Sequence, residues 1–272
     1  NTSGSSISTL NYPMAWNGSF TFTGLNDLNL GTGAITLGAS VIATITANNL
    51  TAAGTISGST FSITKAGNGT LSFGSNDVTI SSLTLSAGTL VSTSGNLNLK
   101  GNFTNSAAFT HNSGTLSFTG TVAQTIGGTV VSQVYNNLVV NKSLALTITG
   151  STTTITVNDF TNTLGSFTPP ATFNVNGNTL LTAGILIAGA TINAAGNWTN
   201  NGGTFTAGAG TVNFNGTAQA IGGSSNHTFN HFTINPTSTI TASSGIISIS
   251  GNWVNDGAFI HNSGTVTFTR TT

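Results

Sequence analysis

Short stretches in which apolar and polar residues alternate occupy most of the chain. Segments 19–23 (SFTFT), 41–46 (VIATIT), 154–157 (TITV) and 265–269 (TVTFT) place an apolar side chain at every second position. A period of two predicts strands that bury one face and expose the other. No stretch shows the sustained apolar spacing of three and four residues that an amphipathic helix requires. The pattern therefore predicts an all-β protein built from many short strands.

The strands are separated by turn-forming dipeptides. Asn-Gly pairs begin at Asn17, Asn68, Asn176, Asn201 and Asn215. Asn and Gly tolerate the positive φ that tight turns demand, so these pairs mark places where one strand ends and another begins. Short strands at near-regular spacing fit a sandwich, a barrel or a solenoid.

An internal repeat favours the solenoid. Residues 101–120 (GNFTNSAAFTHNSGTLSFTG) recur as residues 251–270 (GNWVNDGAFIHNSGTVTFTR), and a third copy begins at Gly196. The first and third copies continue to match downstream, where Tyr135 aligns with Phe229. Repeated units that stack on one another predict a parallel β-helix, with Asn and Thr forming ladders at its corners. At roughly 20–25 residues per coil, the chain would make about eleven to thirteen coils.

The two ends of the chain suggest a division into an N-terminal segment and one solenoid. Residues 1–18 read as an arm or cap, and residues 19–272 as a single continuous solenoid. The last strand, 265–269, is followed by no capping segment, so we expect either a truncated chain or an open edge that another molecule closes. In the second case copies would stack head to tail. The residues predicted to form that contact are Tyr12, Met14, Trp16, Val266, Phe268 and Arg270.

Composition limits the classes of partner. Only 3% of the residues are charged and the formal net charge is zero. The four cations, Lys65, Lys100, Lys142 and Arg270, lie far apart in the sequence, which argues against binding to a nucleic-acid backbone. No apolar run approaches the roughly 20 residues that span a bilayer, so no membrane span is expected.

The chain contains no cysteine and does not begin with methionine. Disulfides and thiol chemistry are thereby excluded. We expect a mature secreted product or a fragment, located outside the cell or at its surface.

The ionisable residues allow structural and chemical interpretations. His111 and His261 occupy the same place in the HNSG turn of the repeat, which favours a turn role. His227 and His231 are four residues apart, about 13 Å along a strand and too far for one metal ion. Four Asp residues also lie beside turns, where a turn role is favoured over catalysis. They are Asp27, Asp77, Asp159 and Asp256.

Aromatic residues recur at one position of the repeat. Phe103, Trp198 and Trp253 each follow a Gly-Asn pair. We expect them to form an apolar stack inside the solenoid, and the alternative is an exposed stripe that stacks on sugars.

The segment 56–91 resembles the passenger-associated repeat of bacterial autotransporters, in which a KxGxGTLxL stretch precedes an xAGTL strand. The matching residues here are Lys65, Gly67, Gly69, Thr70 and Leu71, then Ala87, Gly88, Thr89 and Leu90. The GNW blocks are similar to repeats in large secreted surface proteins of bacteria. The resemblance implies a parallel β-helix displayed outside the cell.

Together these features predict a non-enzymatic extracellular structural protein without cofactor or metal. Its expected partners are copies of itself, stacked end to end in a filament or surface layer. One alternative is a segment of a larger adhesin that binds glycans or other surface proteins. The second is a polysaccharide-degrading β-helix enzyme, which would need Asp77 or Asp159 beside a basic residue in a groove.

Overall fold

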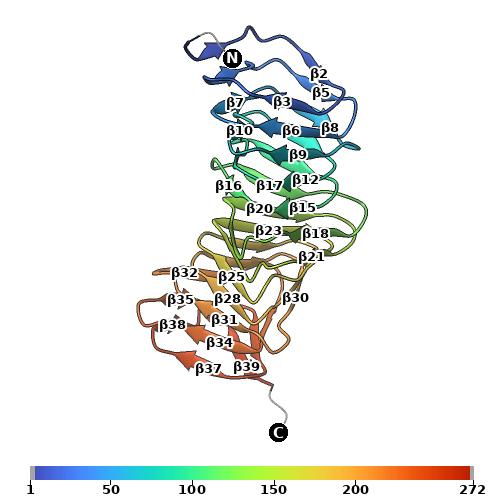
Figure 1. The fold of residues 1–272 in the computed structure, drawn as a ribbon. Coiled ribbons are helices and arrows are strands. Elements are labelled where there is room, and N and C mark those ends of the chain that lie inside the picture. The colour runs from blue at the N-terminus through green and yellow to red at the C-terminus, as the bar shows by residue number, and fades with distance from the viewer. Residues whose placement is uncertain (1–3, 270–272) are drawn as a thin grey trace. The chain divides into compact units, whose positions relative to one another are not determined.

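The computed structural model describes residues 4–269, which form a parallel β-solenoid without helices (Figure 1). A typical turn contributes three short strands, each paired in parallel with strands of the turns before and after it. About thirteen turns are present, which confirms the predicted fold class. The chain divides into two compact units, one of residues up to Asn136 with Thr149–Thr152, the other of Asn137–Ile148 with the residues from Thr153 onward.

The first unit has three walls, each a parallel sheet. The first wall contains β1 (Ile7–Ser8), β4 (Leu28–Asn29), β7 (Asn49–Thr51), β10 (Thr70–Ser72), β13 (Thr89–Val91) and β16 (Ala108–Thr110). The second contains β2 (Met14–Trp16), β5 (Ile35–Leu37), β8 (Ile56–Gly58), β11 (Val78–Ile80), β14 (Asn96–Leu99) and β17 (Thr115–Phe118). The third contains β3 (Phe20–Phe22), β6 (Val41–Ile45), β9 (Ile63–Ala66), β12 (Leu83–Leu85), β15 (Phe103–Asn105) and β18 (Gln124–Gly127). A further strand, β19 (Ser132–Val134), follows.

The second unit is built in the same way. One wall contains β20 (Asn137–Asn141), β23 (Asp159–Leu164), β26 (Thr179–Leu181), β29 (Trp198–Asn200), β32 (Gln219–Gly222), β35 (Thr239–Thr241) and β38 (Ala258–Ile260). Another contains β22 (Thr154–Val157), β25 (Thr172–Val175), β28 (Thr191–Ala194), β31 (Thr211–Phe214), β34 (His231–Ile234) and β37 (Trp253–Asn255). The remaining strands are β21 (Leu146–Ile148), β24 (Ser166–Phe167), β27 (Ile185–Ile187) and β30 (Thr204–Thr206), then β33 (His227–Phe229), β36 (Ile246–Ile249) and β39 (Thr265–Phe268).

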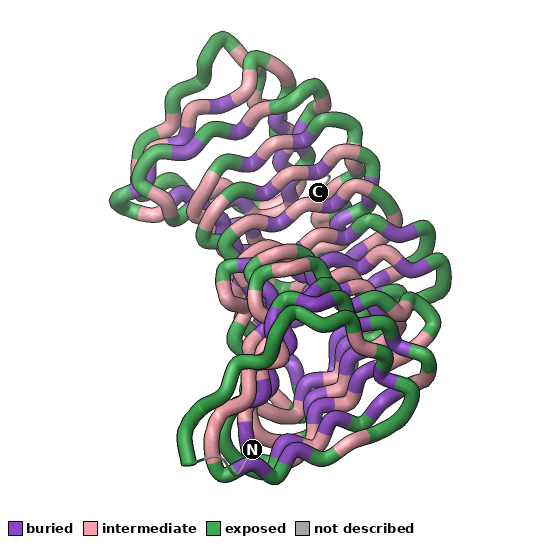
Figure 2. The backbone as a smooth tube through the Cα atoms, turned by 90° about the horizontal axis from the view of Figure 1, so that it is seen from above, coloured by how far each residue is buried: buried purple, intermediate pink, exposed green. Residues whose placement is uncertain are grey.

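Apolar side chains of successive turns stack inside the solenoid. In the first unit Leu50 pairs with Leu71, which pairs with Leu90, and all three are buried. Burying such a side chain contributes about 1.5–3 kcal/mol. Buried and solvent-facing residues alternate along the strands (Figure 2), as the sequence pattern predicted.

Polar side chains at a corner of the first unit link each turn to the next. The Oγ of Ser40 accepts a hydrogen bond from the backbone N–H of Ser62 at 3.0 Å. Ser62 Oγ accepts from the N–H of Ser82 at 3.3 Å, and Ser82 Oγ from that of Asn102 at 2.9 Å. These short uncharged side chains satisfy backbone donors that would otherwise lack a partner where the chain bends.

An asparagine ladder lies on the outer face of β25, β28 and β31. The Nδ2 of Asn193 donates to Oδ1 of Asn174 at 2.7 Å, and Asn213 Nδ2 donates to Asn193 Oδ1 at 2.9 Å. Asn174 Nδ2 in turn donates to Thr156 Oγ1 at 3.0 Å. The sequence predicted such ladders at corners. This one lies on the strands, because parallel in-register pairing places equal side chains directly above each other.

The segment before residue 18 contributes paired strands. Ile7–Ser8 pairs with Leu28–Asn29, and Met14–Trp16 pairs with Ile35–Leu37. The described part of the chain contains no helix with the length and apolar character of a transmembrane segment.

Candidate functional site

The repeated block builds an aromatic cluster inside the first unit. The rings of Phe103 and Phe109 have centroids 5.4 Å apart, and Tyr135 lies 6.0 Å from Phe103 and 5.8 Å from Phe109. All three contacts are edge-to-face, the arrangement that aromatic quadrupoles favour.

The third copy of the block builds the same cluster in the second unit. Trp198 lies 4.9 Å from Phe205 and 5.6 Å from Phe229, and the two Phe rings are 5.8 Å apart. Phe103 and Trp198 are both buried, which confirms their predicted interior position.

The two tryptophans of the second unit have different neighbours. Trp198 lies on β29 and Trp253 on β37, which belong to different walls. The half-buried Trp253 contacts Phe232 and Phe259 instead, at 5.0 and 4.8 Å between ring centroids. The repeat predicted that each ring lies in an apolar setting, but it did not predict which residues surround the ring. The chain between the two copies does not make a whole number of turns, so the second copy begins on a different wall.

A wall of the solenoid is interrupted beside the second cluster. Among the described strands, β30 is the last of its sheet and β33 is the first of another, so no ladder of backbone hydrogen bonds joins them. The same interruption occurs between β16 and β19 in the first unit. Each aromatic cluster therefore lies behind a lateral break in the wall.

In the first unit a buried polar network fills this break. Tyr135 donates its hydroxyl hydrogen to Gln133 Oε1 at 2.6 Å, and Asn105 Nδ2 donates to the same oxygen at 3.4 Å. Gln133 Nε2 donates to Thr152 Oγ1 at 2.7 Å. Burial raises the pKa of Tyr135 well above its usual value, so the phenol stays protonated and able to donate. The hollow beside Phe109 and Tyr135 is too narrow to admit a water molecule.

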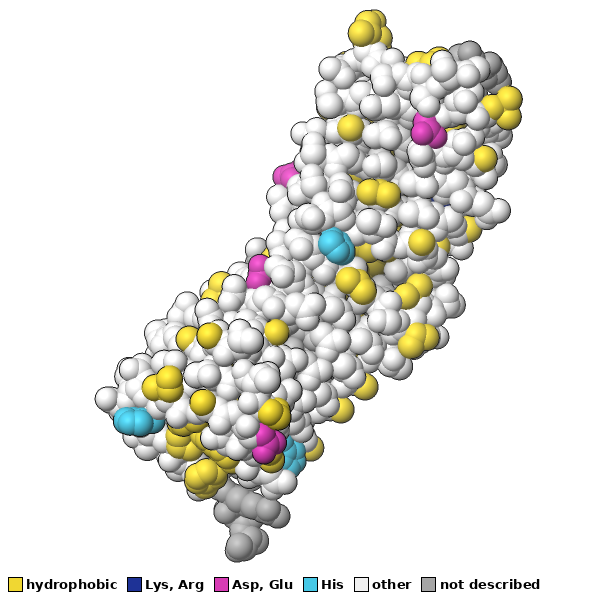
Figure 3. All heavy atoms as spheres, turned by 90° about the vertical axis from the view of Figure 1, so that its left-hand side faces the viewer, with side chains coloured by type: hydrophobic (Ala, Val, Ile, Leu, Met, Phe, Trp, Pro, Cys, Tyr) yellow, Lys and Arg dark blue, Asp and Glu magenta, His cyan; other side chains and the backbone are white. Residues whose placement is uncertain are grey.

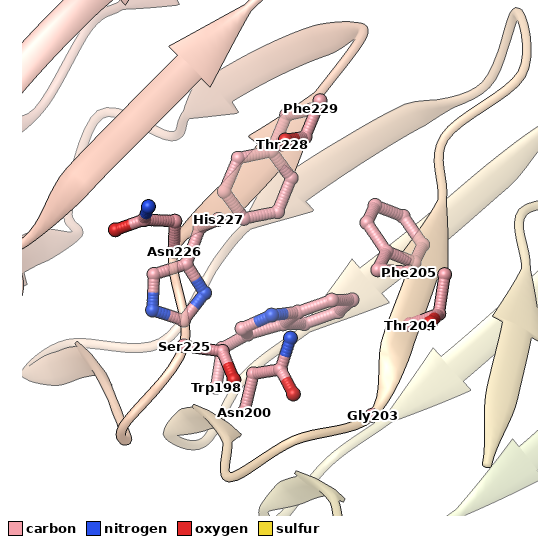
Figure 4. Close-up of a pocket in the computed structure, with 10 residues that line it drawn as sticks. All are labelled: Trp198, Asn200, Gly203, Thr204, Phe205, Ser225, Asn226, His227, Thr228 and Phe229. Atoms are coloured by element: carbon pink, nitrogen blue, oxygen red, sulfur yellow. The ribbon is translucent and has the colours of Figure 1, made fainter. Parts of the chain in front are cut away.

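In the second unit the corresponding place is open. A cavity of about 180 Å³ lies between β30 and β33 (Figure 4). Its lining consists of aromatic, polar and small residues, namely Trp198, Asn200, Gly203, Thr204, Phe205, Ser225, Asn226, His227, Thr228 and Phe229. We call this cavity the lateral pocket.

His227 is the one ionisable residue among those ten. Its side chain is 2% exposed, and Nε2 has no hydrogen-bond partner. Burial lowers the pKa of His227 to about 4, so the imidazole is neutral at neutral pH. Figure 4 shows its ring beside the indole of Trp198, with Asn200 on the same side of the pocket. A buried imidazole nitrogen without a partner is costly, which makes the site chemically distinct from its satisfied counterpart in the first unit.

No family model, curated protein or solved structure matches this chain.

The sequence did not identify the lateral pocket. From the sequence, His227 was weighed only together with His231, as two ligands of one metal ion. The useful signal was the alignment of Tyr135 with Phe229, which also places Gln133 opposite His227. The comparison shows that the second unit lacks the hydroxyl of Tyr135 and the amide of Gln133, the two groups that form the network of the first unit.

The other histidines bind the backbone. Nδ1 of His111 accepts a hydrogen bond from the N–H of Ser113 at 3.0 Å, and Nδ1 of His261 accepts one from Ser263 at 3.1 Å. These bonds confirm the predicted turn role. Nδ1 of His231 accepts from the N–H of Asn252 at 3.0 Å. Within residues 4–269 no three His, Cys, Asp or Glu side chains are grouped to hold a metal ion.

Three of the four Asp residues also bind the backbone of the following turn. Oδ1 of Asp77 accepts from the N–H of Asn96 at 2.8 Å, and Oδ1 of Asp159 from that of Asn178 at 2.6 Å. Asp27 makes the same bond to Asn49 at 2.9 Å. Asp256 is exposed. On the face shown in Figure 3 the acidic side chains lie singly, separated by uncharged surface.

The residues predicted to mediate self-assembly lie on the first and last described turns. Tyr12 is 63% exposed, whereas Trp16 is buried and contacts Phe20 at 4.9 Å. Met14 and Trp16 line an apolar cavity of about 380 Å³ in the first turn. Val266 is half-buried and Phe268 is 63% exposed. Arg270 lies outside the described residues.

Proposed function

We propose that this chain is a non-enzymatic, extracellular structural protein that assembles end to end, the last described turn of one copy stacking on the first turn of the next. The main support is the contrast between Phe268 and Phe118, which occupy the same place in two copies of the repeat. Phe268 is 63% exposed and Phe118 is completely buried. A further turn of solenoid would cover Phe268, as the interior of the chain covers Phe118.

The first turn offers a complementary surface. Its apolar cavity is lined by residues that include Met14, Trp16, Phe20 and Leu28. Among the described strands, β1, β2 and β3 of the first turn and β37, β38 and β39 of the last each have one unpaired edge. Such edges add further strands readily. A contact between unlike ends does not close on itself, so repeated stacking gives a filament.

The composition is compatible with close association. With 3% charged residues and a formal net charge of zero, electrostatic repulsion between copies is small. The uncharged serine and asparagine corners supply polarity without the desolvation cost that charges would add at an interface.

The proposed extracellular location rests on the resemblance to the passenger-associated repeat. Lys65, at the start of that motif, is completely buried and donates from Nζ to the carbonyl oxygens of Gly67 and Ala87 at 2.7 and 3.0 Å. The motif thus ties together two successive turns, which gives its lysine and glycines a physical reason to occur together.

The proposal is tested by measuring particle mass at increasing protein concentration, with light scattering and electron microscopy on the same samples. We expect particles that lengthen with concentration at constant width. A single monomeric species at every concentration would contradict end-to-end assembly.

A second candidate function is adhesion, in which the solenoid displays binding sites along its side. The observation that favours it is the lateral pocket, because it opens between two strands of a wall and not at an end.

A further inference from the structure

The two aromatic clusters differ in a way that creates an opening in one of them. Gln133 and Tyr135 of the first unit are replaced by His227 and Phe229 in the second. Phe229 lacks the phenolic hydroxyl, and the imidazole of His227 does not reproduce the hydrogen bonds of the Gln133 amide. The result is a cavity of about 180 Å³ with an unpaired His227 Nε2, where the first unit has a satisfied network.

The lining favours an uncharged ligand. None of the ten lining residues is Asp, Glu, Lys or Arg, and the pKa of His227 is lowered by burial to about 4. A charged ligand would lose its hydration without gaining a countercharge, which is strongly unfavourable. A neutral ligand avoids this cost.

The lining also favours a ligand with many hydroxyl groups and one apolar face. Asn226 and Thr228 are exposed, and the half-buried Ser225 lies beside them, so hydrogen-bonding groups line one side of the pocket. Phe205 is half-buried and presents its ring from β30 (Figure 4). Hydroxyl, amide and imidazole groups bind hydroxyl groups, and an aromatic ring packs against C–H groups.

The volume limits the size of the ligand. Pockets for drug-sized molecules have about 300–1,000 Å³, and this cavity is smaller. It suits one six-membered ring. Access is lateral, because β30 and β33 are not joined by a ladder and the exposed Thr204 and Thr228 lie on the two sides of the break.

We infer that the lateral pocket binds one neutral monosaccharide unit, with the accessible Ser225, Asn226 and Thr228 hydrogen-bonding its hydroxyl groups and Phe205 packing against its ring. His227 is neutral and almost completely buried, so it brings no charge to the pocket. The site is independent of end-to-end assembly, since its residues lie away from the first and last described turns.

The test uses the full chain with ¹⁵N-labelled tryptophan. D-glucose, D-galactose, D-mannose and N-acetyl-D-glucosamine are each added while the indole N–H signals of Trp16, Trp198 and Trp253 are followed by NMR. We expect at least one sugar to shift the Trp198 signal in a saturable manner and to leave the other two unchanged. The inference is overturned if no sugar shifts Trp198, or if only Trp16 or Trp253 responds.

A pair of double variants makes the test specific. H227Q/F229Y transfers the closed network of the first unit into the lateral pocket, and we expect affinity to fall by about tenfold or more. The matched control, Q133H/Y135F, makes the opposite exchange in the first unit and should leave binding at Trp198 unchanged. Undiminished binding by H227Q/F229Y contradicts the inference.

A third variant does not alter the core. Thr228→Tyr places a bulky side chain at the exposed rim of the pocket and should also abolish the Trp198 shift. It keeps the test decisive if H227Q/F229Y folds poorly, because binding that survives Thr228→Tyr would exclude the lateral pocket as the site.

Discussion

The hydroxyl of Tyr135 donates a hydrogen bond to Oε1 of Gln133 at 2.6 Å in the interior of the first unit. Tyr135 and Gln133 are both almost completely buried. Because the same amide also binds Asn105 and Thr152, one glutamine satisfies groups from several successive turns. The network closes the break between β16 and β19 in the first unit. The corresponding break between β30 and β33 in the second unit stays open beside His227. Two related sequences thus give a closed site and a pocket.

Removing the Tyr135 hydroxyl should weaken the first unit. Tyr135→Phe leaves Gln133 Oε1 with only its longer bond to Asn105, and we expect a loss of about 1–2 kcal/mol in unfolding free energy. Urea denaturation followed by circular dichroism measures this. Tyr12→Phe is the matched control, because Tyr12 is 63% exposed and should change stability by less than about 0.5 kcal/mol. Equal effects of the two substitutions would contradict the assigned role of the network.

Lys65 should be far more important for stability than Lys100. Lys65 is buried, with Nζ donating to the carbonyl oxygens of Ala66, Gly67 and Ala87 at 3.0, 2.7 and 3.0 Å. Lys65→Met leaves three carbonyls without that donor, and we expect a loss of about 2–4 kcal/mol.

Lys100→Met is the control for this substitution. Lys100 is exposed and makes one long bond, 3.4 Å from Nζ to the carbonyl oxygen of Thr119. Its replacement should cost less than about 0.5 kcal/mol. The denaturation midpoints of the two variants, measured at one pH, show which substitution costs more stability. A Lys65→Met protein as stable as the wild type would show that the carbonyl contacts contribute nothing.

Acidification should destabilise the second unit through His227. Burial lowers the pKa of this residue from 6.5 to about 4, so the unfolded chain binds a proton more readily than the folded chain between these values. Stability from this group is complete above pH 6.5 and is lost as the pH falls towards 4, by about 3 kcal/mol in total. No other ionisable side chain lines the pocket to offset this effect.

The contribution of His227 is isolated by comparison with His227→Gln. Unfolding free energy is measured for both proteins at intervals from pH 7 to pH 4. The stability of the wild type relative to His227→Gln should fall by about 3 kcal/mol from pH 7 to pH 4, because only the wild type loses the contribution of a neutral imidazole. Parallel curves over the whole range would indicate that His227 titrates normally.

End-to-end assembly should depend on Phe268. Phe268→Asp places a charge where the proposed contact is apolar, and burial of an unpaired carboxylate is unfavourable. We expect the concentration needed for half-maximal assembly to rise about tenfold or more. Ile42→Asp is the control, since Ile42 is 48% exposed but lies on β6, within the side of the first unit. Sedimentation of assembled material measures both, and identical behaviour of the two variants would remove the last turn from the interface.

Much of the fold could be predicted from local patterns. The alternation in 41–46 predicted a strand, and the structure has Val41–Ile45 with Val41, Ala43 and Ile45 buried and Ile42 exposed. The HNSG turn predicted structural histidines, and both accept a backbone hydrogen bond. The strand and the two turns depend on residues close in the sequence, so the sequence alone was sufficient to predict them.

The sites could not be predicted in the same way. Nothing near Lys65 in the sequence shows that Ala87 supplies one of its acceptors, because that contact joins two turns. The pocket at His227 likewise requires Trp198, which is brought close only by stacking.

The sequence by itself determined that the chain is an all-β solenoid with an apolar interior and uncharged corners, since alternation, turn residues and repeats act locally. The tertiary structure decided which residues of different turns meet. Trp198 and Trp253 belong to equivalent blocks, yet they lie on different walls. The physical reason is that the number of residues per turn varies slightly, and these differences add up along the chain. Small differences in turn length therefore decide on which wall each copy of the block lies, and the exchange of Gln133 and Tyr135 for His227 and Phe229 decides whether the cluster is filled or open.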